Sequence, residues 1–152
     1  MLSVFGVAPS EVVSAGSVLV EFPPLSGQAV GGVIPLDCQV SVLKLADSAL
    51  NSTMLWPWKP AERGYVIAAR NVQSSVIKNH LRQIRHIQDS TGCNRIWPWF
   101  DPRYLKLALN CLEGRALQNL FGPLELYGFA DDSGVEILQL RSGRIHVSTV
   151  QP

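Results

Sequence analysis

The chain has 152 residues, the length of a single domain. Hydrophobic residues make up 47% of it, which excludes intrinsic disorder. The formal net charge of +1 argues against a function that depends on strong electrostatic attraction to nucleic acid or to anionic lipid. Charged residues are 16%, against about 25% in an ordinary domain. We therefore expect apolar surface that a partner covers.

The N-terminal region predicts neither a signal peptide nor a membrane helix. The first ten residues lack a basic segment, and the apolar stretch from 15 to 36 is interrupted by Glu21 and Pro23-Pro24. The three cysteines are an odd number without a Cys-x-x-Cys pair, so neither a zinc knuckle nor a redox pair is indicated. We expect a reduced, soluble, cytoplasmic protein without membrane insertion.

The first half of the chain is expected to be mainly extended. Short β-branched runs predict strands, and Pro and Gly mark the loop between them. The region from 36 to 50 fits either period, and its end from 44 leans helical. The predicted segments are strands over 3–7 and 17–22, a helical turn over 11–14, a loop over 23–32 and a buried strand over 65–69.

The middle of the chain is predicted to be helical. A first helix over 76–88 has Ser74 or Ser75 as N-cap and one apolar stripe, formed by Ile77, Leu81, Ile84 and Gln88. A turn over 89–92 and an extended segment over 95–100 follow. Asp101-Pro102 is a favoured helix start, with Asp as N-cap and Pro at the first helical position. That second helix should stop at Gly114, and a short third helix over 116–121 should end at Gly122-Pro123.

The last thirty residues alternate between apolar and polar positions. Segments 124–130, 135–140 and 144–150, separated by Asp-Asp-Ser-Gly and Ser-Gly turns, predict a three-stranded antiparallel meander. The fold class is therefore α+β in a single compact domain, with N-terminal strands, central helices and the C-terminal meander.

The sequence contains no recognisable catalytic constellation. His80 and His86 would lie on opposite sides of the first helix, and His146 is far away in sequence, so a shared metal is not indicated. Asp131-Asp132 fits a hairpin turn. Glycine-rich phosphate loops and hydrolase motifs are missing from the sequence. We expect no metal, no cofactor and no catalytic residue.

All four tryptophans fall in two Trp-Pro-Trp triplets, 56–58 and 97–99. In an extended chain both indoles of a triplet point to the same side, and the proline suits an edge strand or a strap. Trp97 and Trp99 are then either aromatic anchors of a binding surface or a lid over the core. A nucleic-acid platform near Arg95 and Arg103 is disfavoured by the neutral net charge.

A basic stripe lies beside the apolar stripe of the first helix. Lys78, Arg82 and Arg85 form it, either as a solvated face, as internal partners of a carboxylate such as Asp101, or as contacts to an acidic partner. Internal pairing is the favoured interpretation. Arg103 lies in the first turn of its helix, where a cation opposes the helix dipole, and we expect a carboxylate to hold it.

Three short motifs in order resemble a known family. They are His80-Leu81-Arg82, the junction from Ile96 to Asp101-Pro102-Arg103, and Phe121-Gly122-Pro123. Together they resemble the effector chaperones of type VI secretion, the Tap or Tec adaptors. The junction departs from the family pattern at Trp97-Pro98-Trp99, and the family's opening strand and helix are shortened or missing at Met1.

The resemblance implies a chaperone without catalytic activity. Such a protein would occupy residues 1–152 as one domain, with a family-like core over 76–123 and the meander over 124–150. It would bind a toxic effector in the cytoplasm and promote its loading on the VgrG spike. Partner-binding candidates are Trp97, Trp99, Lys78, Arg82 and Arg85, beside structural motif residues His80, Leu81, Asp101, Pro102, Arg103, Phe121, Gly122 and Pro123. The alternative is a small enzyme or nucleotide-binding domain whose residues are dispersed beyond motif range.

Overall fold

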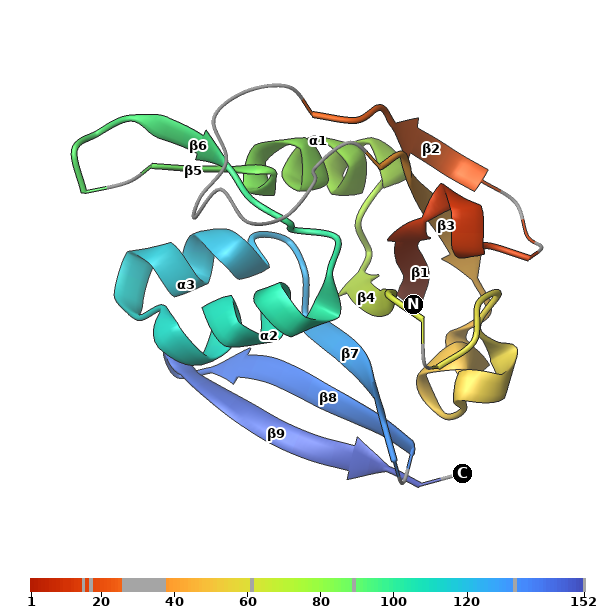
Figure 1. The fold of residues 1–152 in the computed structure, drawn as a ribbon. Helices are drawn as coiled ribbons and strands as arrows, with labels where there is room; N and C mark the ends of the chain where they lie inside the picture. The colour runs from red at the N-terminus through yellow and green to blue at the C-terminus, as the bar shows by residue number, and fades with distance from the viewer. Residues whose placement is uncertain are drawn as a thin grey trace.

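A computed structural model describes residues 1–14, 16, 18–25, 38–60, 62–88, 90–132 and 134–151. The predicted α+β class is confirmed: within these residues a seven-stranded antiparallel sheet carries three α-helices on one face, and a separate two-stranded hairpin follows the first of them (Figure 1). Some residues of the expected segments lie outside the described residues: residue 17 of the strand over 17–22, residues 26–32 of the loop, residues 36 and 37 of the ambiguous region, and turn residues 89 and 133.

The large sheet has the strand order β2-β3-β1-β4-β7-β8-β9, and each neighbouring pair is antiparallel. The C-terminal meander is confirmed as its last three strands. The bounds are β1 (Leu2–Pro9), β2 (Val18–Phe22), β3 (Val40–Leu45), β4 (Tyr65–Arg70), β7 (Leu126–Asp131), β8 (Gly134–Arg141) and β9 (Arg144–Val150).

The ambiguous region before the first tryptophan triplet divides into two kinds of structure. Residues 40–45 join the sheet as β3. The end of the ambiguous region, which was expected to be helical, forms a 3₁₀ turn, η2 (Asp47–Leu50), and a second 3₁₀ turn, η3 (Thr53–Leu55), follows it. The helical turn expected after the first strand is η1 (Ser10–Val12). Strand pairing decides the assignment of β3, because Val40 and Val42 face the helices in register with β1.

Helix α1 (Ser74–Ile84) is shorter than predicted. Its N-cap is Gln73, so the expected capping by Ser74 or Ser75 is wrong, and it ends at Ile84 rather than at residue 88. The apolar stripe stops at Ile84, and its next position in a longer helix would be the polar Gln88. The chain instead satisfies its backbone groups by pairing β5 (His86–Gln88) with β6 (Asn94–Ile96).

Helices α2 (Pro102–Cys111) and α3 (Gly114–Phe121) follow closely. The predicted N-cap of α2 is confirmed, since the Asp101 carboxylate accepts the backbone N–H of Arg103 at 3.0 Å. Gly114 does not stop α2, which ends at Cys111; it is the first residue of α3. Gly122 ends α3 with a φ of 50°, as the sequence predicts.

Two apolar cores lie on opposite faces of the sheet. Side chains of α1, α2 and α3 pack on one face, while η2 and the first tryptophan triplet cover the other. The central strand β4 serves both, with Tyr65 and Ile67 toward the helices and Val66 and Ala68 away from them. None of the helices in the described ranges has the length and apolar character needed to cross a bilayer.

Candidate binding groove

A groove of about 1040 Å³ lies between α1, the β5–β6 hairpin and α3. We call it the α1–α3 groove. Residues from both outer motifs of the family resemblance line it, His80 on one side and Gly122-Pro123 on the other. Its lining residues are Val76, Asn79, His80, Gln83, Ile84, His86, Ile87, Gln88, Trp97, Ala108, Leu112, Arg115, Ala116, Gln118, Asn119, Leu120, Gly122 and Pro123.

His80 joins the two helices that form the groove. Its imidazole is 6% exposed, and Nε2 lies 3.0 Å from the carbonyl oxygen of Leu120, so the neutral ring donates this hydrogen bond. Burial lowers the pKa of His80, and the bond to Leu120 opposes that shift in part. The Tyr127 hydroxyl donates to the same carbonyl. Two side chains therefore satisfy an end of α3 that would otherwise lack partners.

Gly122 lies directly against His80. A Cβ atom at this position would be 2.4 Å from Nδ1 of His80, and the φ of 50° already favours glycine. The His80 ring fits only because residue 122 has no side chain, so this contact gives a physical reason for both outer motifs. Leu81 and Phe121 beside them are buried in the helical core.

The interior of the groove combines apolar surface with side-chain amides. Asn79 and Gln83 are four residues apart on α1, and Gln118 and Asn119 face them from α3. Arg115 is the one lining residue with a permanent charge among those described. Amides can donate to and accept from a peptide backbone, so this lining suits a polypeptide segment.

Sequence reasoning missed these amide residues. On each helix a pair of polar residues spaced by four lies beside an apolar stripe, Asn79 with Gln83 and Arg115 with Asn119, and this spacing is the signal that the sequence contains. The signal carries little weight alone, because exposed helix faces commonly contain such residues. Only the packing of α1 opposite α3 converts two polar faces into one groove.

The second tryptophan triplet lies in the core. Trp97 is 6% exposed and Trp99 1% exposed. The Trp97 indole N–H donates to the carbonyl oxygen of Ile84, and Trp99 packs edge-on against Phe22 with ring centroids 5.5 Å apart. The burial of both indoles agrees with the alternative in which Trp97 and Trp99 form a lid over the core, and it does not support exposed anchors of a binding surface. Trp97 still contributes a small surface to the α1–α3 groove.

The first tryptophan triplet is a strap over the opposite face. Trp56 donates its indole N–H to the Ala49 carbonyl at 2.9 Å, and Trp58 covers Gly6 and Gly64, where any Cβ would lie within 3 Å of the indole. The two triplets therefore close the two cores of the sheet separately.

The basic stripe does not pair with Asp101. The guanidinium groups of Arg82 and Arg85 lie over the Phe22 ring, 5.8 and 4.8 Å from its centroid, and Arg82 also donates to Asn79 at 3.0 Å. Burial and then the Arg82 charge lower the pKa of Arg85. The expected pairing with Asp101 is therefore wrong for this stripe, and stacking on Phe22 replaces it. Lys78 is half-buried on the same helix.

Asp101 holds Arg103 instead. The fully buried carboxylate accepts from Nε and Nη2 of Arg103 at 3.1 and 2.7 Å, and this pairing raises the pKa of Arg103. The expectation that a carboxylate holds this cation is confirmed. One carboxylate caps α2 and neutralises the cation in its first turn, so the Asp101-Pro102-Arg103 motif is structural.

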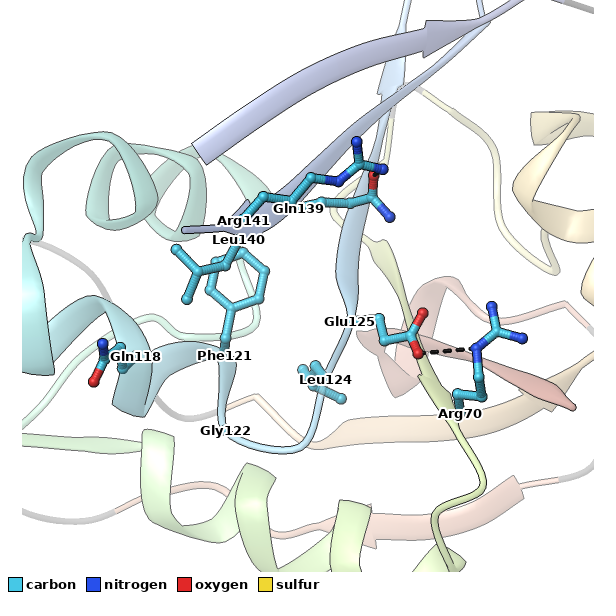
Figure 2. Close-up of a pocket in the computed structure, with 9 residues that line it drawn as sticks. All are labelled: Arg70, Gln118, Phe121, Gly122, Leu124, Glu125, Gln139, Leu140 and Arg141. Atoms are coloured by element: carbon cyan, nitrogen blue, oxygen red, sulfur yellow. Dashed lines mark hydrogen bonds and ion pairs between the residues drawn. The ribbon is translucent and has the colours of Figure 1, made fainter. Parts of the chain in front are cut away.

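A smaller, open hollow of about 650 Å³ is lined by the end of α3, the residues just before β7, and the ends of β4 and β8 (Figure 2). Its charged groups already have partners. Arg70 lies 3.1 Å from Glu125, and Arg141 donates to Gln139 at 2.8 Å. It therefore offers a ligand fewer unengaged groups than the α1–α3 groove.

No arrangement for metal binding is found among the described residues, where groups of three or more His, Cys, Asp or Glu side chains do not occur. His80 and His86 do line the same groove, so the argument that a helix separates them is wrong, because His86 belongs to β5. The three cysteines form no disulfide. Comparison of the chain with protein-family models, curated proteins and solved structures yields no match.

Proposed function

We propose that this protein is a chaperone without catalytic activity, which binds a type VI secretion effector in the cytoplasm and promotes its loading on the VgrG spike. The observation that carries the proposal is the contact between the outer family-like motifs. His80 and Gly122 pack against each other, and both line the α1–α3 groove. Residues that resemble a family of binding proteins are thus gathered at this groove of about 1040 Å³.

The chemistry of the groove supports a protein ligand. Within the described lining there are amides, apolar side chains, one arginine and two histidines, but no Asp, Glu, Ser, Cys or Lys side chain. Most nucleophiles and carboxylate acid–base groups are drawn from those missing types. The alternative of a small enzyme or nucleotide-binding domain therefore receives less support. A segment of the effector would fill the groove and exchange hydrogen bonds with the amides.

The proposed binding of an effector is tested by co-expression with the toxin encoded beside this gene, followed by size-exclusion chromatography. We expect one complex of fixed stoichiometry. Separate elution of the two folded proteins at micromolar concentration would contradict the proposal.

The groove is tested with a matched pair of variants. Ala116→Trp fills the α1–α3 groove from α3, and Leu107→Trp places the same indole on an exposed site of α2 outside it. We expect the dissociation constant to rise about tenfold or more for Ala116→Trp only, since loss of a central contact typically costs more than 1 kcal/mol. Equal affinity of both variants would place the effector elsewhere.

A further inference from the structure

The two edges of the large sheet differ in their protection. β2 at one edge has a register irregularity between Val18 and Val20, carries Glu21 and runs into Pro23-Pro24. Such features prevent a sheet edge from pairing with another chain. β9 at the other edge pairs with β8 in unbroken register over seven residues and contains no proline. Figure 1 shows β9 as the outermost strand of the meander.

The free backbone groups of β9 can be assigned from the hairpin. Ser142 and Gly143 both have positive φ in a two-residue turn, which makes Arg141 and Arg144 the hydrogen-bonded pair that closes it. Hydrogen-bonded residues alternate along an antiparallel ladder. The N–H and C=O groups of Ile145, Val147 and Thr149 therefore point away from β8. We call these three residues the β9 edge.

We infer that the β9 edge pairs with the β9 edge of a second copy of this chain, antiparallel about a two-fold axis at Val147. In this register Val147 faces its own symmetry mate, and Ile145 faces Thr149 of the other copy. All six outward-pointing residues then form hydrogen-bonded pairs. Each pair consists of β-branched side chains, the type that packs best across strands.

Charge and exposure favour the second copy as occupant. Arg144 lies opposite Val150 and His146 opposite Ser148, so no two like charges face each other across the pairing. A net charge of +1 leaves little repulsion between copies. The Val147 side chain is 59% exposed in the single chain, and the two-fold axis covers it with an identical side chain. An isologous contact of this kind closes after two copies.

The oligomeric state of the purified chain tests this inference without any effector, so its outcome is independent of the proposed function. Analytical ultracentrifugation from micromolar to millimolar concentration, in reductant, should give a monomer–dimer equilibrium. Val147→Lys places two cations at the axis and should weaken the dimer about tenfold or more. Leu107→Lys, with the same 59% exposure on α2, should not. A wild-type monomer throughout, or equal dimerisation of both variants, would overturn the inference.

Cross-linking tests the register. Residues opposite each other in a hydrogen-bonded pair have Cα atoms about 5.5 Å apart, within reach of a disulfide. With the exposed Cys93 and Cys111 replaced by Ser, oxidation of Val147→Cys should yield a covalent dimer, whereas Leu107→Cys should not. Equal cross-linking of the two variants would contradict pairing at the β9 edge. Loss of effector binding in Val147→Lys, with a monomeric wild type, would assign the edge to the effector and overturn the self-pairing.

Discussion

Gly122 and His80 show at the level of single residues how two motifs 42 positions apart form one site. The glycine provides the space and the backbone angle, and the histidine fills that space and donates to the end of α3. In the sequence alone, Gly122 indicates only the end of a helix, and His80 has no evident role. The contact between them accounts for both.

Gly122→Ala should destabilise the protein by about 3 kcal/mol, because it adds steric overlap with His80 to an unfavourable backbone angle. Gly114→Ala is the matched control. Gly114 has a φ of 56° but open space where a Cβ would lie, so only the backbone term of about 1 kcal/mol should appear. Urea unfolding measures both values. Equal losses would show that the contact with His80 has no energetic weight.

His80 should make stability depend on pH. Its folded pKa is lowered by burial, so the unfolded chain binds the proton more readily. The contribution of the neutral ring is complete above the unfolded pKa of about 6.5 and is lost as the pH falls from there toward the folded pKa. Chemical unfolding between pH 8 and 5 should show this decline.

His80→Gln keeps a donor for the Leu120 carbonyl and should reduce the fall in the free energy of unfolding between pH 8 and 5. His86→Gln, which changes an exposed histidine of β5, should leave that fall unchanged. An unchanged pH profile in His80→Gln would assign the dependence to other groups.

At the level of elements, Trp97 connects the segment after β6 with helix α1. Its indole reaches from the segment after β6 to the last turn of α1, where it donates to Ile84. Trp97→Ala should cost about 3–5 kcal/mol as a large core truncation. Trp97→Phe keeps most of the packing and should cost less. Thermal unfolding measures the loss, and reduced effector binding with unchanged stability would restore the anchor interpretation.

The elements also mark the limit of sequence reasoning. The meander was predictable because its alternation and turns are local signals, and α2 because Asp101-Pro102 defines its start. The end of α1 was not, because the pairing of His86–Gln88 with β6 depends on residues further along the chain. The location of Arg82 and Arg85 over Phe22 depends on a contact across sixty positions, which spacing along one helix does not reveal.

At the level of the whole molecule, Arg82 is the residue of the basic stripe that is exposed to a partner, whereas Lys78 and Arg85 are half-buried. Arg82 is exposed beside Asn79 of the α1–α3 groove. If the effector presents acidic surface there, Arg82→Glu with Arg85→Glu should slow association, most strongly at low salt. Lys59→Glu, an exposed change beside the first tryptophan triplet, is the control. Stopped-flow binding measures the rates, and equal rates for both variants would exclude the stripe from the interface.

The separation of the two tryptophan triplets has an optical consequence. Trp56 and Trp58 report on the core that includes η2, and Trp97 and Trp99 report on the core beneath the three α-helices. All four indoles are shielded from water in the folded chain, so exposure of either pair on unfolding should shift its fluorescence to longer wavelength. A chain in which one pair is replaced by Phe would then follow the opening of a single face of the sheet. The molecule thus carries two intrinsic reporters, one for each side.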